Sequence, residues 1–168
     1  MKTKVVTLIA GLFLLAACTT AGDQGAGADA GGGAAAAPQV AAAVGIVPGS
    51  QEDLAVNVGD RVYFAFDKFD LTDEAQNALR AQAQWLARNP SVTVTIEGHA
   101  DERGTREYNL ALGERRANSA KELLVALGVD GSRVTVISFG KERPAVLGSN
   151  EAAWALNRRA VTVVNPAE

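Results

Sequence analysis

The chain has 168 residues, a formal net charge of −3 and a charged fraction of 21%. This length accommodates one ordinary domain together with additional segments. The mildly acidic balance argues against a nucleic-acid partner, which requires a basic surface. The single cysteine, Cys18, excludes an internal disulfide framework and a cysteine-based metal site.

Residues 1–17 have the pattern of a signal peptide. Two lysines precede an apolar run over residues 5–17, which is shorter than the ~20 residues that a membrane-spanning helix requires. The alternative interpretation is a membrane anchor that stays attached. Leu15-Ala-Ala-Cys18 resembles the bacterial lipobox. This resemblance implies that the mature chain begins at a lipidated Cys18, and the following Thr19 implies sorting to the outer membrane.

Residues 18–52 are interpreted as the lipidated cysteine and a flexible tether. Alanine and glycine dominate the stretch, which has no amphipathic pattern. Such a composition cannot bury enough apolar surface to offset the entropy of ordering the chain. The alternative for residues 40–44 is a short helix, but Pro38 and Pro48 bracket it closely. As a coil of roughly 30 residues, the tether would have a reach on the order of 30 Å.

Residues 53–168 are expected to form one folded domain. β-Branched and aromatic residues, partly in strict alternation, predict four strands, over residues 61–66, 91–97, 133–139 and 160–164. Helical spacing and end signals predict three helices between them. They run from the N-cap Thr72 to Asn89-Pro90, over residues 105–127 with Gly128 as the stop, and over residues 151–156.

The order β-α-β-α-β-α-β predicts an α/β (α+β) two-layer sandwich. In this fold a mixed sheet carries its helices on one face. Trp85 and Trp154 are the large aromatic residues expected in its core.

A polar span, residues 98–116, joins the second strand to the second helix. Charged residues are rarely buried without a partner, and segments between regular elements often carry function. The pattern alone also fits simpler interpretations. Arg115 and Arg116 beside Glu114 are typical of a solvated helix face, and Asp101 is typical of a loop or capping residue.

His99 stands two residues before Asp101, a spacing that suggests a catalytic or metal site. Because there is no second histidine and no other cysteine, we expect no metal and a hydrogen-bonded, structural His99. We expect Tyr108 to contribute packing. We expect Arg158 and Arg159 to brace the loops rather than to form a surface pair.

Four regions, in order, resemble the OmpA-like domain family. The most specific are Glu97-Gly-His-Ala-Asp-Glu-Arg-Gly104 and Asn109-Leu-Ala-Leu-Gly-Glu-Arg-Arg-Ala-Asn118. The others are residues 62–68, and residues 140–146 together with 157–159. Behind a lipobox, these motifs are most similar to the peptidoglycan-associated lipoproteins of that family. Ala65 departs from the pattern, since many relatives carry a charged or larger residue there.

The resemblance implies a protein that binds peptidoglycan without covalent linkage, with no catalytic residue, cofactor or metal. It places the diaminopimelate of the stem peptide between Asp101 and Arg116. Around the ligand it also places Asp67, Arg103, Thr105 and Leu112.

The same resemblance implies an outer-membrane lipoprotein with its domain in the periplasm, tethering the membrane to the cell wall. It implies TolB and other Tol proteins as further partners, in a system that serves envelope integrity and cell division. TolB is expected on or near the face that binds peptidoglycan, so the two would compete.

The residue types suit this ligand, because the free end of diaminopimelate carries an ammonium and a carboxylate on one carbon. Arginine offers a fork of donors for the carboxylate, and an acid meets the ammonium. Leu112 and Arg116 share a helix face, so Leu112 can pack against the methylene chain. The alternative function is a cell-wall hydrolase using His99, Asp101 and Glu102, for which no nucleophile with a nearby base is visible.

Overall fold

The computed structural model describes residues 45–166. The predicted signal peptide, the lipidation site Cys18 and the tether up to residue 44, with its possible short helix, lie outside these residues. None of the helices between residues 45 and 166 has the length and apolar character needed to cross a bilayer.

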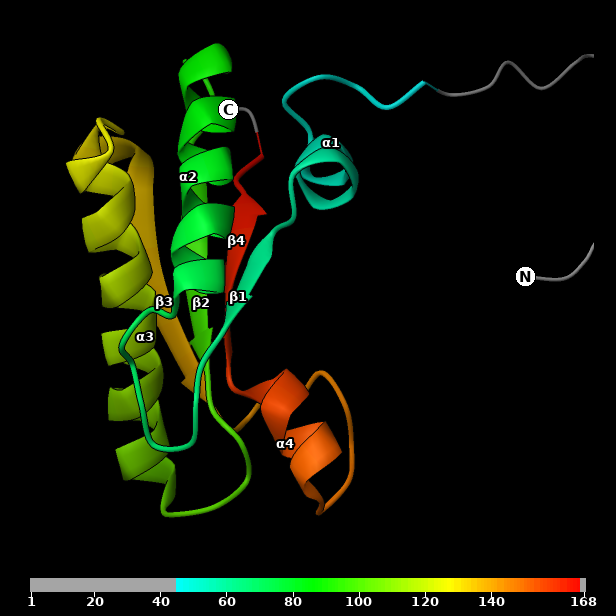
Figure 1. The fold of residues 1–168 in the computed structure, drawn as a ribbon, viewed down its shortest axis with the longest axis vertical. Coiled ribbons are helices and arrows are strands. Elements are labelled where there is room, and N and C mark those ends of the chain that lie inside the picture. The colour runs from blue at the N-terminus through cyan, green and yellow to red at the C-terminus, as the bar shows by residue number, and fades with distance from the viewer. Residues whose placement is uncertain (1–44, 167–168) are drawn as a thin grey trace, which may run out of the picture. The chain divides into compact units, whose positions relative to one another are not determined.

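One layer of the domain is a four-stranded mixed sheet with the order β1-β4-β2-β3 (Figure 1). Its strands are β1 (Arg61–Tyr63), β2 (Val94–His99), β3 (Val134–Gly140) and β4 (Arg159–Val164). β2 and β3 are parallel, whereas β4 is antiparallel to both β1 and β2. The predicted mixed sheet is confirmed.

The helices are α1 (Gln51–Asn57), α2 (Asp73–Arg88), α3 (Arg106–Ala126) and α4 (Glu151–Asn157). The long helices α2 and α3 cover one face of the sheet, and α4 lies beyond the end of the strands (Figure 1). The predicted cap at Thr72 is present, since its side chain accepts from the backbone N–H of Ala75. Gly128, at φ 95°, follows the end of α3 in the left-handed conformation that a helix stop favours.

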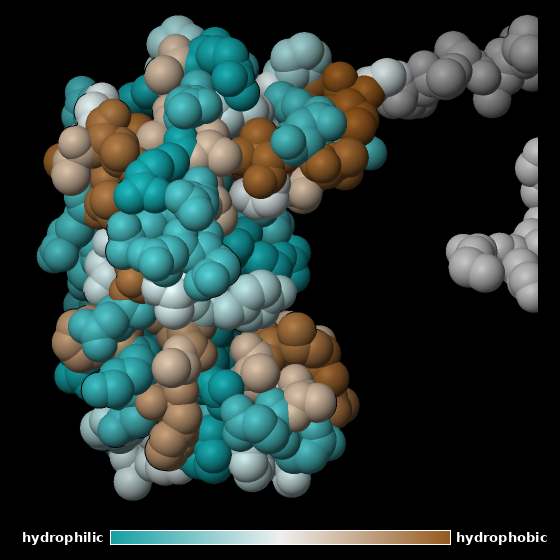
Figure 2. Space-filling model, viewed as in Figure 1, coloured by the Kyte–Doolittle hydropathy of each residue, from teal (hydrophilic) through white to brown (hydrophobic). Residues whose placement is uncertain are grey.

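The core lies between the two layers and is made by aliphatic residues of α2, α3 and the strands around Trp85. Trp154 is not part of it, so that prediction was wrong. Trp154 is half-buried at the end of the sheet, where its ring contacts the guanidinium of Arg103. Figure 2 shows a largely hydrophilic face over α2 and α3, with apolar side chains gathered over α1 and α4.

Helix α1 was not predicted and depends on contacts with distant segments. Leu54 is fully buried in the core. The Trp85 indole Nε1 donates to Asp53 Oδ2 at 2.8 Å, and the backbone N–H of Val164 donates to Gln51 Oε1 at 2.7 Å. These contacts attach α1 to the end of the sheet at which β2 begins and β4 finishes.

Helix α3 approaches β2 unusually closely because two glycines face each other. A Cβ atom added to Gly98 would stand 1.8 Å from the carbonyl oxygen of Gly113. The Ser138 hydroxyl, on the neighbouring strand β3, donates to the Leu110 carbonyl of α3 at 2.6 Å. This approach fixes the first half of α3 against the carboxyl ends of β2 and β3, beside the polar span.

Candidate ligand-binding site

A cavity of about 190 Å³ opens at the carboxyl end of β2. Its walls come from the segment after β1, the loop after β2 and the first half of α3. The residues that line it are Phe66, Asp67, Ala100, Asp101, Arg103, Gly104, Tyr108, Asn109, Leu112 and Arg116. Five of the six residues expected around the ligand are therefore brought together. The sixth, Thr105, is instead the N-cap of α3, where its hydroxyl accepts from Tyr108 N.

Arg116 is completely buried and is one of the residues that line the cavity. Nε donates to the Lys68 carbonyl at 2.8 Å, Nη1 to the His99 carbonyl at 2.8 Å, and Nη2 to the Ala65 carbonyl at 3.1 Å. Of its five N–H groups, one on each terminal nitrogen makes no hydrogen bond within residues 45–166. Burial lowers the pKa of Arg116 to about 10, partly offset by Asp101, so the side chain stays cationic at neutral pH.

The carboxylate of Asp101 is fully engaged by protein donors. Oδ1 accepts from the Arg103 backbone N–H and Nε, both at 3.1 Å. Oδ2 accepts from Arg103 Nη2 at 2.6 Å and from Arg158 Nη1 at 3.4 Å. Burial alone would raise the pKa of Asp101, but the hydrogen bonds from Arg103 lower it below its ordinary value. Asp101 and Arg116 thus face one cavity without forming an ion pair with each other.

Asp67 is a second acid of the cavity, and it has more open acceptor positions. Between residues 45 and 166 it is the one non-glycine residue with positive φ, at 56°. It accepts one hydrogen bond there, from the hydroxyl of Tyr108. Tyr108 is 46% exposed at the cavity wall, so its expected role in packing was wrong.

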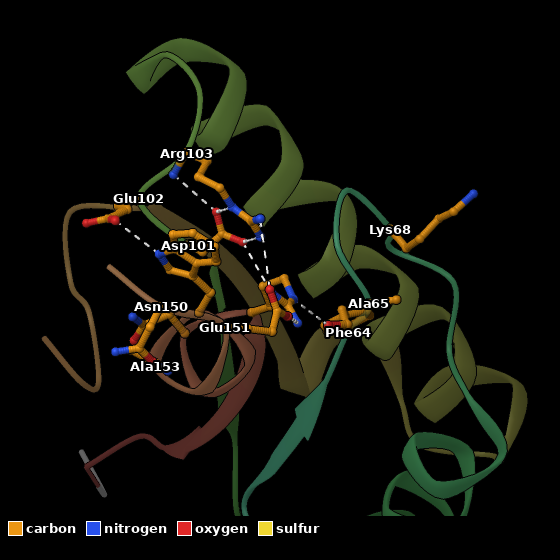
Figure 3. Close-up of polar contacts among 12 residues, drawn as sticks. Phe64, Ala65, Lys68, Asp101, Glu102, Arg103, Asn150, Glu151 and Ala153 are labelled. Carbon is orange, nitrogen blue, oxygen red and sulfur yellow. Dashed lines mark hydrogen bonds and ion pairs between the residues drawn. The ribbon is translucent and has the colours of Figure 1, made fainter. Parts of the chain in front are cut away.

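Arg103 is held between two aromatic rings. Its Cζ lies 4.0 Å from the ring centroid of Phe66 and 4.0 Å from that of Trp154. In Figure 3, the Arg103 side chain extends over the Asp101 carboxylate, with Glu151 beside it, while Lys68 points away. Trp154 Nε1 also donates to Glu102 Oε1 at 3.0 Å. Sequence reasoning missed this role of Trp154.

The prediction that Arg158 and Arg159 brace the loops is confirmed. Besides Asp101, Arg158 donates to the Phe64 carbonyl at 3.0 Å and to Glu151 Oε1 at 2.7 Å. Arg159 donates to the carbonyls of Asn157 at 3.3 Å and Arg143 at 3.2 Å. Arg158 links α4 to the Asp101 carboxylate, and Arg159 links the start of β4 to the loop before α4.

His99 does not make the hydrogen bonds expected of it. His99 is only 1% exposed, and neither of its ring nitrogens has a hydrogen-bond partner among the described residues. Nε2 lies 3.5 Å from Glu97 Oε2, and the ring stacks on Phe139 at 5.7 Å between centroids. Burial, followed by the charge of Arg159, lowers the pKa of His99 to about 4. The imidazole is therefore neutral at physiological pH.

The three residues of the hydrolase alternative do not converge on the cavity. His99 is not among the residues that line it, Asp101 has its acceptor positions filled, and Glu102 is occupied by Trp154. Nowhere between residues 45 and 166 do three or more potential His, Cys, Asp or Glu ligands gather around a metal position.

Comparisons with known proteins agree on one family. The model of the OmpA family matches residues 63–160. A peptidoglycan-associated lipoprotein of Rhizobium meliloti is 52% identical over 135 residues, covering 77% of this chain and 77% of that protein. One of Brucella melitensis is 53% identical over 120 residues, covering 71% of each chain.

Solved structures have the same fold. The crystal structure of the peptidoglycan-associated lipoprotein from Burkholderia pseudomallei has a TM-score of 0.62 at 45% identity, covering 63% of this chain and 90% of that one. The C-terminal domain of Helicobacter pylori MotB has a TM-score of 0.60 at 15% identity, covering 64% and 85% of the two chains. The similarity to MotB shows a common fold and nothing further.

Proposed function

Because the chain belongs to the OmpA family and, within it, to the peptidoglycan-associated lipoproteins, we propose that it binds peptidoglycan non-covalently and performs no chemistry on it. The ligand group is the free end of diaminopimelate in the stem peptide. It enters the cavity between the loop after β2 and the first half of α3.

The observation that carries this proposal is the hydrogen bonding of Arg116, a buried residue that lines the cavity. Three backbone carbonyls fix its position, and two N–H groups have no partner within the described residues. A buried, fixed fork of this kind suits a carboxylate, because little side-chain freedom is lost on binding. The N-terminus of the 21-residue helix α3 lies beside the same cavity and favours a negative group there.

The ammonium of the ligand is assigned to the acidic side of the cavity. Asp67 supplies the direct acceptor, because Asp101 already accepts four hydrogen bonds from Arg103 and Arg158. Asp101 contributes its negative charge and holds Arg103 in place. Leu112 lines the cavity and packs against the methylene chain, whereas Thr105 acts indirectly by capping α3.

A titration of the full chain with two stem tripeptides tests the pocket. One carries meso-diaminopimelate and the other carries lysine, which lacks the terminal carboxylate. We expect the first to bind at least about tenfold more tightly, as for hydrogen bonds to a charged group. Equal affinity for both peptides would remove the assigned role of Arg116.

The acidic side is tested with Asp67→Asn. Both peptides carry the ammonium, so this variant should bind both more weakly. Asp73→Asn, an exposed acid in the first turn of α2, is the matched control and should bind as the wild type does. If Asp67→Asn retains full affinity for both peptides, the ammonium lies elsewhere.

The proposal extends to the envelope. Lipidation at Cys18 would anchor the chain in the outer membrane with its domain in the periplasm, tethering the membrane to the wall. Cys18→Ser should then be absent from the outer-membrane fraction, and its retention there would refute the anchor. Family membership supports TolB as a partner that competes with peptidoglycan, and displacement of bound wall fragments by purified TolB tests this.

A further inference from the structure

Arg115 is an exposed cation whose side chain makes no hydrogen bond or ion pair with any residue from 45 to 166. Neighbouring arginines differ, since Arg103 is paired with Asp101 at 2.6 Å and Arg106 with Glu142 at 3.3 Å. The Cζ atom of Arg115 lies 5.6 Å from the ring centroid of Phe69 and 5.9 Å from that of Tyr108. Within residues 45–166, this guanidinium therefore interacts with aromatic faces and forms no ion pair with an acid.

The position of Arg115 is continuous with the cavity. Tyr108 lines the cavity and donates to Asp67, and Arg115 lies over the same tyrosine ring. Arg115 also precedes Arg116 on α3, with one side chain buried in the cavity wall and the other exposed. The three residues Asp67, Tyr108 and Arg115 thus form a row that leads from the cavity to the surface.

We propose that Arg115 is a second anion-binding point, which recognises the free α-carboxylate of the γ-linked glutamate that precedes diaminopimelate in the stem peptide. This inference rests on the proposed function, since diaminopimelate in the cavity places the preceding residue at the mouth. A γ-linkage leaves the α-carboxylate of that glutamate ionised and unused in the chain. The rings of Phe69 and Tyr108 hold the guanidinium and leave its N–H edge free for the anion.

Under this proposal, Arg115 is a specificity-determining residue that distinguishes stem peptides with a free glutamate α-carboxylate from those in which it is amidated. A wall in which this carboxylate is converted to an amide offers no anion to Arg115. The contact is exposed to water, so its contribution is that of a surface ion pair and is screened by salt.

The test uses the full chain and two tripeptides at low ionic strength, L-Ala-γ-D-Glu-meso-diaminopimelate and the same peptide with D-isoglutamine. We expect the wild type to prefer the free carboxylate by roughly fivefold, the upper range of an exposed ion pair. Arg115→Gln should bind both peptides equally. Arg80→Gln, an exposed arginine on α2 that contacts Asn77 and Gln76, is the matched control and should keep the preference.

Free meso-diaminopimelate separates this inference from the proposed function. Arg115→Gln and the wild type should bind it equally, because it lacks the glutamate. If Arg115→Gln keeps the wild-type preference between the two tripeptides, Arg115 is not the anion-binding point. If the wild type binds none of the three probes, the proposed function fails and this inference fails with it.

Discussion

Asp101 and Arg103 form a two-pronged ion pair, with Nε donating to Oδ1 at 3.1 Å and Nη2 donating to Oδ2 at 2.6 Å. An ion pair between two loop residues two positions apart ordinarily contributes little to stability, because ordering both side chains costs entropy. Here Phe66 and Trp154 enclose the guanidinium from two sides, and Arg158 binds the same carboxylate. The acidic wall of the cavity is therefore ordered before a ligand arrives.

Trp154→Ala should weaken binding of the diaminopimelate tripeptide, although Trp154 does not line the cavity. Arg103 loses one of its two aromatic contacts, which corresponds to a roughly threefold or greater loss of affinity. Leu156→Ala on the same helix is the control, since Leu156 is exposed and outside the cavity. Calorimetric titration of both variants measures the difference, and equal affinities would show that Arg103 needs no support from Trp154.

Arg116→Ala should lose both wall binding and stability. Removing the guanidinium takes a donor from the carbonyls of Lys68 and His99, of which the His99 contact is buried, while the Ala65 carbonyl keeps the Lys68 backbone N–H. At about 1–3 kcal/mol for a buried unsatisfied group, the free energy of unfolding should fall by about 1–3 kcal/mol. Denaturant unfolding of the variant measures this loss. A variant as stable as the wild type would mean that the His99 carbonyl finds another donor.

Gly98→Ala should destabilise the domain strongly, because the new Cβ would overlap the Gly113 carbonyl oxygen at 1.8 Å. Backbone atoms stand on both sides of the contact, so α3 would have to move away from β2. We expect a loss of about 3 kcal/mol or more in the free energy of unfolding. Gly131→Ala is the control, since its nearest neighbour is a Val125 side-chain atom at 3.6 Å. Similar unfolding midpoints for the two variants would contradict the close approach.

His99 should make stability depend on pH in the mildly acidic range. The folded-state pKa of about 4 lies below the ordinary 6.5, so folding favours the neutral imidazole. This contribution is complete above pH 6.5 and is lost as the pH falls toward 4. Burial and the charges of Arg159 and Arg143 lower this pKa, and the backbone of Arg143 opposes the shift only in part.

The measurement compares denaturant unfolding of the wild type with that of His99→Phe. Between pH 7.5 and pH 5 the wild type should lose about 2 kcal/mol more than the variant, which has no imidazole to protonate. Parallel pH dependence of the two proteins would show that His99 is protonated as readily in the folded state as in the unfolded one.

The regular elements between Arg61 and Val164 follow from local patterns. Alternation predicted the strands and helical spacing with capping residues predicted α2 and α3, so the sheet and its one-sided helices were correct. Two features were not local. Strand β1 ends at Tyr63 rather than at Phe66, with the chain turning at Asp67. Helix α1 has a local N-cap at Ser50, but Trp85 and Val164, from distant segments, bind its side chains.

The sequence predicted which residues belong to the candidate site better than it predicted how their side chains are arranged. Five expected residues line one cavity, and their part in binding stays a prediction. The sequence pattern does not predict that Arg116 donates three hydrogen bonds to carbonyls of distant segments. It also does not predict that Arg103 and Arg158 fill the acceptor positions of Asp101. Both facts depend on how separate loops meet, which spacing along one helix cannot reveal.

The attachment of α1 at one end of the sheet has a mechanical consequence. Gln51 contacts β4 at Val164, whereas the cavity lies at the opposite end of the strands, where Gly98 pairs with Ala160. A pull exerted between residue 45 and a molecule held in the cavity would run lengthwise along β1, β4 and β2. Such a load would act in shear on the antiparallel pairs β1–β4 and β2–β4, so the ladder bonds of each pair would share it instead of breaking one at a time.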